Sequence, residues 1–150
     1  MASFSQTRDT VIDAPPATVH ALLDDFHAWQ DWSPWEEMDP DLERTYSGAE
    51  KGVGAQYAWS GNKKVGTGRM EITSSTAERI DIDLEFIEPF KARNQAIFEL
   101  TPHGKGTRVE WTMAGERNLL MSAMGKLYFD KAIAKDFDRG LAKLRALAEA

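Results

Sequence analysis

The side chains that could transfer a proton are the first candidates for chemistry in this sequence. Three histidines are present, and His27, beside the tryptophan cluster, has carboxylates close to it in the chain at Asp24, Asp25 and Asp31. Histidine suits acid–base chemistry near neutral pH, but a general base also needs an orienting partner and a substrate within reach. The spacing of these residues fits no set of metal ligands. We therefore predict no catalytic residue, no metal site and no cofactor, and His27 is the one histidine that merits a test.

Aromatic side chains with a polar group form a second set of candidates. Tyr57 and Tyr128 could each donate a hydrogen bond to a ligand carbonyl. Three of the five tryptophans, Trp29, Trp32 and Trp35, lie within one short segment. Two interpretations follow: Trp32 and Trp35 close one end of the hydrophobic core, as aromatic clusters usually do, or one indole lines the mouth of a pocket.

Composition restricts the classes of protein to which the chain can belong. With 150 residues, 42% of them hydrophobic, residues 1–150 are predicted to form one domain with a substantial core. The formal net charge of −6 argues against nucleic-acid binding, because phosphate affinity depends on clustered Lys and Arg. The absence of cysteine excludes disulfides and thiolate metal sites. Because no apolar run has membrane-spanning length and the start lacks signal-peptide features, we predict a cytoplasmic protein without membrane insertion.

The segment from Asp130 to Glu149 is predicted to form the long helix around which the chain is organised. Its apolar residues recur every three or four positions and so share one face. They are Ile133, Phe137, Leu141, Leu144 and Ala148. Gly140 lies beside this face, and we expect it to allow the close approach of another backbone. Residues 118–129 are predicted to form a short preceding helix whose apolar face is rotated away, which indicates a bend near Gly125.

β-forming residues before position 53, and two-residue periodicity from Val53 onward, predict seven β-strands. The expected ranges are 4–12, 42–46, 53–60, 65–73, 79–87, 92–101 and 107–115, with two short helices after the first strand. Consecutive short strands joined by tight turns favour an antiparallel meander with one apolar face. Sheets of this size twist and curl. The predicted fold class is therefore α+β, a curved antiparallel sheet wrapped around the C-terminal helix, with a cavity where the wrapping is incomplete.

Several motifs, taken in order, resemble a known family. They are DAPPATVHALLDD, DWSPW, GAQYAWSGNKKVGTGRMEI, the strand end at Pro89, GKGTRVEWTMAG and FDRGLAKLRALAE. Together they resemble the polyketide cyclase/dehydrase and lipid-transport-like branch of the START-like (SRPBCC) superfamily over nearly the whole chain. The resemblance implies the helix-grip fold, with a deep apolar cavity between a seven-stranded sheet and the C-terminal helix. It also implies binding of lipids, sterols, polyketides or hormones, with cyclisation or dehydration in a minority of members, and it transfers no catalytic residue.

The apolar faces of the predicted strands and helices supply the candidate binding residues. Periodicity alone favours an ordinary filled core, and the resemblance adds the expectation of a ligand-sized cavity. The residues predicted to line it are Trp32, Trp35, Tyr57, Trp59, Met70, Ile82, Leu84, Phe86, Phe98, Trp111, Met113, Met124, Tyr128, Ile133 and Phe137. Gly66 and Gly68, on the same face, would leave room or allow a bend.

The functional prediction is the binding of a small hydrophobic molecule, such as a lipid or a polyketide, by a monomer or homodimer. Two alternatives stay open. One is a cyclase/dehydratase-type enzyme that uses the same cavity, with Tyr57 or His27 moving protons. The other is a protein-interaction module whose cavity is closed.

Overall fold

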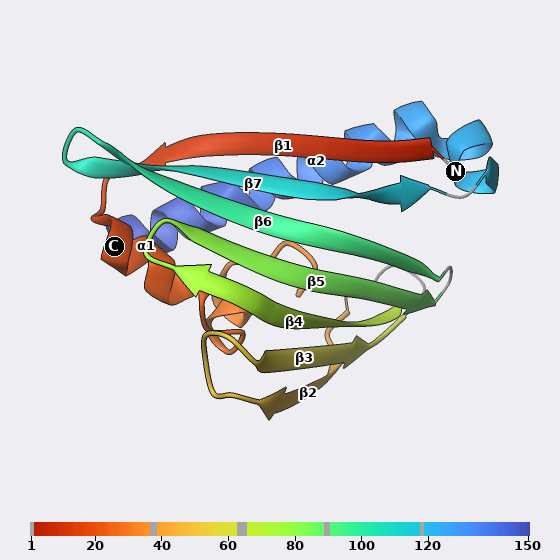
Figure 1. Ribbon diagram of the computed structural model, residues 1–150, viewed down its shortest axis with the longest axis horizontal. Helices are drawn as coiled ribbons and strands as arrows, with labels where there is room; N and C mark the ends of the chain where they lie inside the picture. Colours follow the sequence, from red (N-terminus) through yellow and green to blue (C-terminus); the bar gives the residue numbers. More distant parts are fainter. Residues whose placement is uncertain (1, 37–38, 63–65, 89–90, 118) are drawn as a thin grey trace.

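The chain folds into one curved sheet with helices on its inner side (Figure 1). This computed structural model describes residues 2–36, 39–62, 66–88, 91–117 and 119–150, and among these the side chains of 5–36, 39–62, 66–88, 91–115 and 134–150. The elements are β1 (Ala2–Ile12), α1 (Pro16–Leu23), the 3-10 helix η1 (Ala28–Asp31), β2 (Glu43–Gly48), β3 (Ala55–Ser60), β4 (Thr67–Thr76), β5 (Arg79–Glu88), β6 (Ala92–His103), β7 (Gly106–Arg117) and α2 (Leu119–Glu149).

All neighbouring strands are antiparallel, in the order β1-β7-β6-β5-β4-β3-β2. The alternation predicted for β5 is present: Ile80, Ile82 and Leu84 are buried on the inner face, whereas Asp83 is exposed on the outer face. Register shifts in β4, beside Gly68 and between Ile72 and Ser74, bend the sheet further, because bulges increase local twist. The predicted α+β class with a helix-grip architecture is confirmed.

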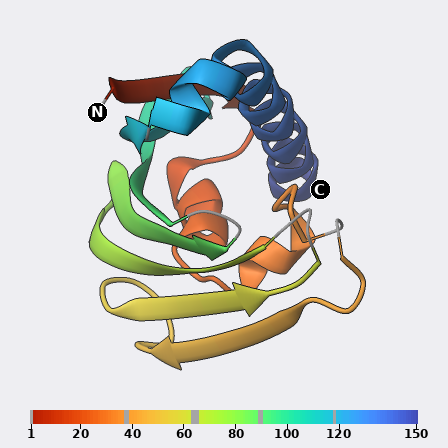
Figure 2. The same cartoon turned by 90° about the vertical axis from the view of Figure 1, so that its right-hand side faces the viewer.

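Two short helices follow β1 as predicted, and both lie inside the curve of the sheet (Figure 2). The predicted separation of a short helix at 118–129 from the final helix is wrong, because α2 is assigned as one helix over Leu119–Glu149. Its ribbon nevertheless changes direction between its light-blue first part and its dark-blue last part (Figure 2). Among the described residues, no helix is both long and apolar enough to span a membrane.

The last part of α2 packs mainly against β1 and closes one side of the curve. Phe137, Leu141 and Leu144 of the predicted apolar face are buried, and the side chain of Ile133 lies outside the described residues. On the solvent side, Arg8 of β1 donates two hydrogen bonds to Asp138, at 2.9 and 2.8 Å. This bidentate pair joins α2 to the edge strand at the surface.

Gly140 allows a close approach on α2, but its neighbours are side chains and not the predicted backbone. A Cβ atom at this position would lie 2.9 Å from Cδ of Pro34 and 3.1 Å from Cζ3 of Trp111. Pro34 belongs to the segment that follows η1 in the chain. Because Gly140 has no side chain, the rings of Pro34 and Trp111 can pack closely against α2. The segment Ser33–Glu36 is held there by a 2.7 Å hydrogen bond from Arg139 to the carbonyl oxygen of Pro34.

The first prediction concerns this contact. Glycine-to-alanine changes inside a helix normally stabilise by about 1 kcal/mol, but Gly140→Ala should destabilise the protein by about 1–2 kcal/mol because the ring of Pro34 cannot swing away. Urea unfolding would measure the change. Ala146→Gly, at an exposed site of the same helix, is the matched control and should cost about 1 kcal/mol. A more stable Gly140→Ala protein would contradict the close packing described above.

Candidate functional site

Strand register aligns the inward-facing residues of the sheet into rows that cross several strands. From the α1 side outward, the rows are Ile80–Phe98–Trp111, Ile72–Ile82–Ala96–Met113, Met70–Leu84–Asn94–Gly115 and Trp59–Gly68–Phe86. The side chains of the first two rows are buried, whereas those of Met70, Trp59 and Phe86 are only half-buried. We call the first two rows the closed end of the inner face and the last two rows the open end.

The closed end is filled by aromatic rings. Trp111 stacks on Phe137 of α2 with ring centroids 3.9 Å apart, and on Phe98 of β6 at 5.0 Å. Trp32 meets Trp111 edge-on at 5.6 Å, and its indole nitrogen donates to the carbonyl oxygen of Leu22 at 3.0 Å. Since both the ring and the N–H group of Trp32 have partners within the protein, its surroundings agree with the interpretation that this cluster closes the core.

At the open end, a glycine creates space for an aromatic side chain. The indole of Trp59 lies across Gly68 of the neighbouring strand, where a Cβ atom would be 2.5 Å from the ring. Phe86 contacts the Trp59 ring edge-on, with centroids 6.0 Å apart. The two rings flank Gly68, and Met70 lies two residues further along β4. All three side chains are half-buried, so this end presents apolar side chains that are covered only in part.

Asn94 places an unpartnered polar atom on this apolar surface. The residue is 8% exposed, and its side-chain oxygen has no hydrogen-bond partner among the described residues. The amide oxygen lies over Gly115 of β7, where any side chain would collide with it. Buried acceptors almost always have a partner, so this oxygen is an exception among the described residues.

A buried polar network, absent from the predictions, connects the segment after η1 with β2 and β3. The Glu36 side chain is only 7% exposed and accepts hydrogen bonds from Arg44 at 2.6 Å and from the Tyr57 hydroxyl at 2.8 Å. Burial raises the pKa of Tyr57, and the adjacent Glu36 carboxylate raises it further. The phenol therefore stays protonated and acts as a fixed donor to Glu36.

Most residues predicted to line a cavity lie on the inner face or against it. Seven are core residues of the sheet and of α2, namely Tyr57, Ile82, Leu84, Phe98, Trp111, Met113 and Phe137, while Trp32 and Trp35 come from the segment around η1. Trp59, Met70 and Phe86 are at the open end. The side chains of Met124, Tyr128 and Ile133 lie outside the described residues. Contact of these fifteen residues with a ligand stays a prediction.

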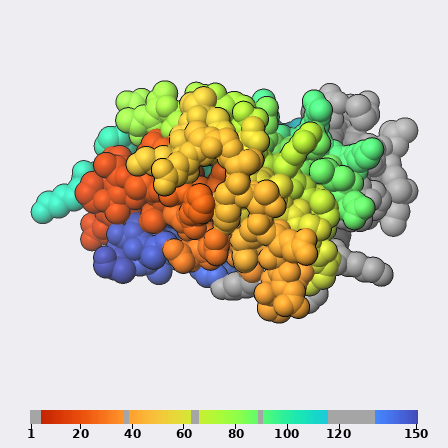
Figure 3. Space-filling view, turned by 90° about the horizontal axis from the view of Figure 1, so that it is seen from below, coloured from red at the N-terminus to blue at the C-terminus, as the bar shows by residue number. Residues whose placement is uncertain are grey.

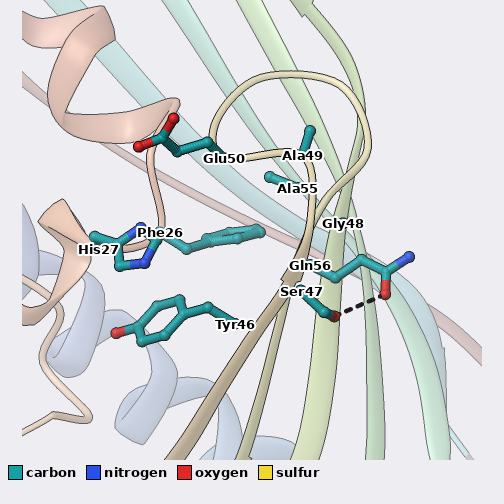
Figure 4. Close-up of a pocket in the computed structure, with 9 residues that line it drawn as sticks. All are labelled: Phe26, His27, Tyr46, Ser47, Gly48, Ala49, Glu50, Ala55 and Gln56. Atoms are coloured by element: carbon teal, nitrogen blue, oxygen red, sulfur yellow. Dashed lines mark hydrogen bonds between the residues drawn. The ribbon is translucent and has the colours of Figure 1, made fainter.

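His27 has an orienting partner in Asp25, one of the three carboxylates that the sequence places near it. Its Nδ1 atom and its backbone N–H both lie 2.9 Å from Oδ1 of Asp25, and its ring stacks on Tyr46 with centroids 4.0 Å apart. His27 and Tyr46 border a pocket of about 300 Å³ beside β2 and β3 (Figure 4). None of the predicted cavity residues is among those described as lining it. Within the described ranges, no group of His, Asp and Glu is arranged to hold a metal ion.

Comparison with known proteins places the chain in a family. The sequence profile described as "Polyketide cyclase / dehydrase and lipid transport" matches residues 1–149. The chain belongs to this family. The resemblance inferred from the motifs is thereby confirmed, and the curved sheet closed by α2 is the shared architecture. A search of curated proteins found no match.

Solved structures with the same fold share little sequence with this family member. The crystal structure of protein CV1439 from Chromobacterium violaceum has a TM-score of 0.71 at 16% identity, with 97% of each chain covered. The solution structure of KanY protein has a TM-score of 0.74 at 14% identity and covers 100% of both chains. The Aha1 dimer from Colwellia psychrerythraea has a TM-score of 0.68 at 16% identity, covering 97% of this chain and 96% of that one. At such identities the likeness establishes the fold alone.

The second prediction uses the raised pKa of Tyr57. A folded-state pKa above the unfolded value of about 10 means that protonated Tyr57 stabilises the fold below pH ~10 and that this contribution is lost as the pH rises further. Tyr57→Phe should cost about 1–2 kcal/mol at neutral pH through loss of the hydrogen bond to Glu36, and stability should then decline less above pH ~10. Urea unfolding across this pH range would measure both effects. An equally steep decline in the variant would show that Tyr57 is not the responsible group.

Proposed function

We propose that this chain binds a small hydrophobic molecule against the inner face of the sheet, at the open end. The observation that carries the proposal is the change in burial along the inner face, from closed aromatic packing around Trp111 to half-buried Trp59, Met70 and Phe86. A surface inside the fold that is apolar and incompletely covered favours an apolar occupant. Membership of a family described by polyketide cyclisation and lipid transport supports the same assignment.

The binding energy would come from burial of the ligand. Each methylene group removed from water contributes about 0.8 kcal/mol, so a ligand of ten carbons or so has enough apolar surface for micromolar affinity. Trp59 and Phe86 supply flat apolar walls, and Met70, an unbranched side chain, can adapt its shape to the ligand.

Asn94 would orient the molecule. Its buried side-chain oxygen accepts a hydrogen bond, so the proposed ligand carries a hydroxyl or another donor on an otherwise apolar body. Gly115 provides the space that the amide oxygen occupies, because the Cβ atom of any larger residue would collide with it. One polar contact in an apolar site is the usual means of fixing a ligand's direction.

The third prediction tests this assignment by native mass spectrometry of freshly purified protein, followed by tryptophan fluorescence titration with a panel of lipids and aromatic polyketides. We expect a co-purifying or titrating apolar molecule. Asn94→Leu should weaken binding of a hydroxylated ligand about tenfold and should not lower the stability of the free protein, because it removes an unsatisfied buried oxygen.

Gln95→Leu is the matched control for this experiment, since it makes the same type of change one residue away on the exposed outer face of β6. It should leave binding unchanged. Failure of every apolar ligand to bind the folded protein would refute the proposed function. Turnover of a bound polyketide would instead favour the alternative of a cyclase/dehydratase-type enzyme.

A further inference from the structure

The pocket beside His27 lies at the β2 edge of the sheet, away from the open end, and has a different chemistry. Its volume of about 300 Å³ is at the lower end of the range for small-molecule sites. Phe26 and Ala55, both buried, form its apolar floor, and the stacked rings of His27 and Tyr46 form one wall. The segments that contribute these residues, around η1 and β2, lie side by side on the face of the molecule seen from below (Figure 3).

The opposite wall of the pocket is a turn that the backbone holds rigidly. Gly48, Gly52 and Gly54 have φ angles of +69°, +71° and +93°, which other residues rarely adopt. The N–H of Ala49 donates to the carbonyl oxygen of Gly54 at 3.1 Å, and the N–H of Gly52 donates to that of Asp24 at 2.9 Å. The second bond attaches the turn to the end of α1. Both walls of the pocket are therefore held in place before any ligand arrives.

The ring of His27 is fixed in orientation and in tautomer. The Asp25 carboxylate can only accept, so Nδ1 carries a hydrogen; in the uncharged form of the ring, Nε2 is then the acceptor. Stacking on Tyr46 sets the plane of the ring, since the two planes are inclined by only 17°. No hydrogen bond to Nε2 of His27 occurs within the described part of the chain, so this lone pair is free to accept one.

The carboxylate that lines the pocket belongs to Glu50, and Lys51 follows it in the same turn. The side chain of Glu50 extends over the opening toward His27 (Figure 4). Asp25 lies behind the His27 ring, and neither lysine nor arginine is among the described residues that line the pocket. With a formal net charge of −6 on the whole chain, an anion would be repelled, whereas a cation would be attracted by Glu50 and by the aromatic faces.

We propose that this pocket is a second binding site, separate from the open end, and that it takes a small planar organic cation. The aromatic floor and wall contact the flat apolar part of the ligand. Its charged N–H groups donate to the Glu50 carboxylate and to Nε2 of His27. The site selects against neutral and anionic analogues, because only a cation satisfies both acceptors and the local charge.

The experiment uses benzamidine as the probe, with benzyl alcohol and benzoate as neutral and anionic analogues of similar size. Backbone amide chemical shifts of Ala49, Glu50 and Ala55, followed by NMR during titration of the full chain, report occupancy of the pocket. We expect the chemical-shift changes to saturate with benzamidine. The two analogues should bind with at least about tenfold lower affinity, and the affinity for benzamidine should fall as the salt concentration rises.

Two variants separate a specific contact from general charge. Glu50→Gln should weaken benzamidine binding by about fivefold or more, because it removes the carboxylate at the opening. Glu43→Gln, an exposed site at the far end of β2, makes the same change in net charge and should leave binding nearly unchanged. Equal binding of benzoate, equal losses in the two variants, or no response to benzamidine at millimolar concentration would each overturn the proposal. The outcome does not depend on whether the inner face binds an apolar ligand.

Discussion

The stack of Phe98, Trp111 and Phe137 is the contact on which the rest of the fold depends. It joins two neighbouring strands to α2 in one continuous aromatic column, with the Trp111 and Phe137 rings inclined by only 6°. A curved sheet gains stability only if something fills its inner face, and a single helix can reach only part of it. The column fills the part that α2 reaches. Trp32 and Trp35, which contact Trp111 edge-on, then connect the segment after η1 to the same column.

The two ends of the inner face differ in how completely they are packed. At the closed end, large rings contact one another and leave no polar group for a ligand except the Trp111 indole nitrogen, which has no hydrogen-bond partner among the described residues. At the open end, Gly68 and Gly115 replace side chains, and the space is shared by fewer large residues. A protein of this size can keep an incompletely filled surface only if another part of its core is well packed, because its net stability is small. The stability contributed by the densely packed closed end thus allows the open end to remain incompletely filled.

The fold was predictable because its signals are periodic. Alternation in β5 and the spacing of Phe137, Leu141 and Leu144 identified the inner face of the sheet and the buried face of α2 correctly. The separate helix at 118–129 was wrongly predicted because a rotated apolar face can also arise when a single helix changes direction. Contacts between residues far apart in the sequence left no such signal. The local sequence around Glu36 does not indicate its hydrogen bonds with Arg44 and Tyr57. Alternation in β6 places Asn94 on the inner face but does not indicate that its oxygen lacks a partner.

Glu36 and Asn94 show why an unsatisfied polar group carries functional information and a satisfied one does not. Both side chains are more than nine-tenths buried, so each must offset the loss of hydration. Glu36 does so with Arg44 and Tyr57, each of which donates to one of its two oxygens, and this network ties the segment after η1 to β2 and β3. Asn94 has no such compensation for its oxygen within the described chain. A leucine of similar size would fit an apolar surface at lower cost in the free protein. The presence of an amide there is explained if the missing partner belongs to a bound molecule.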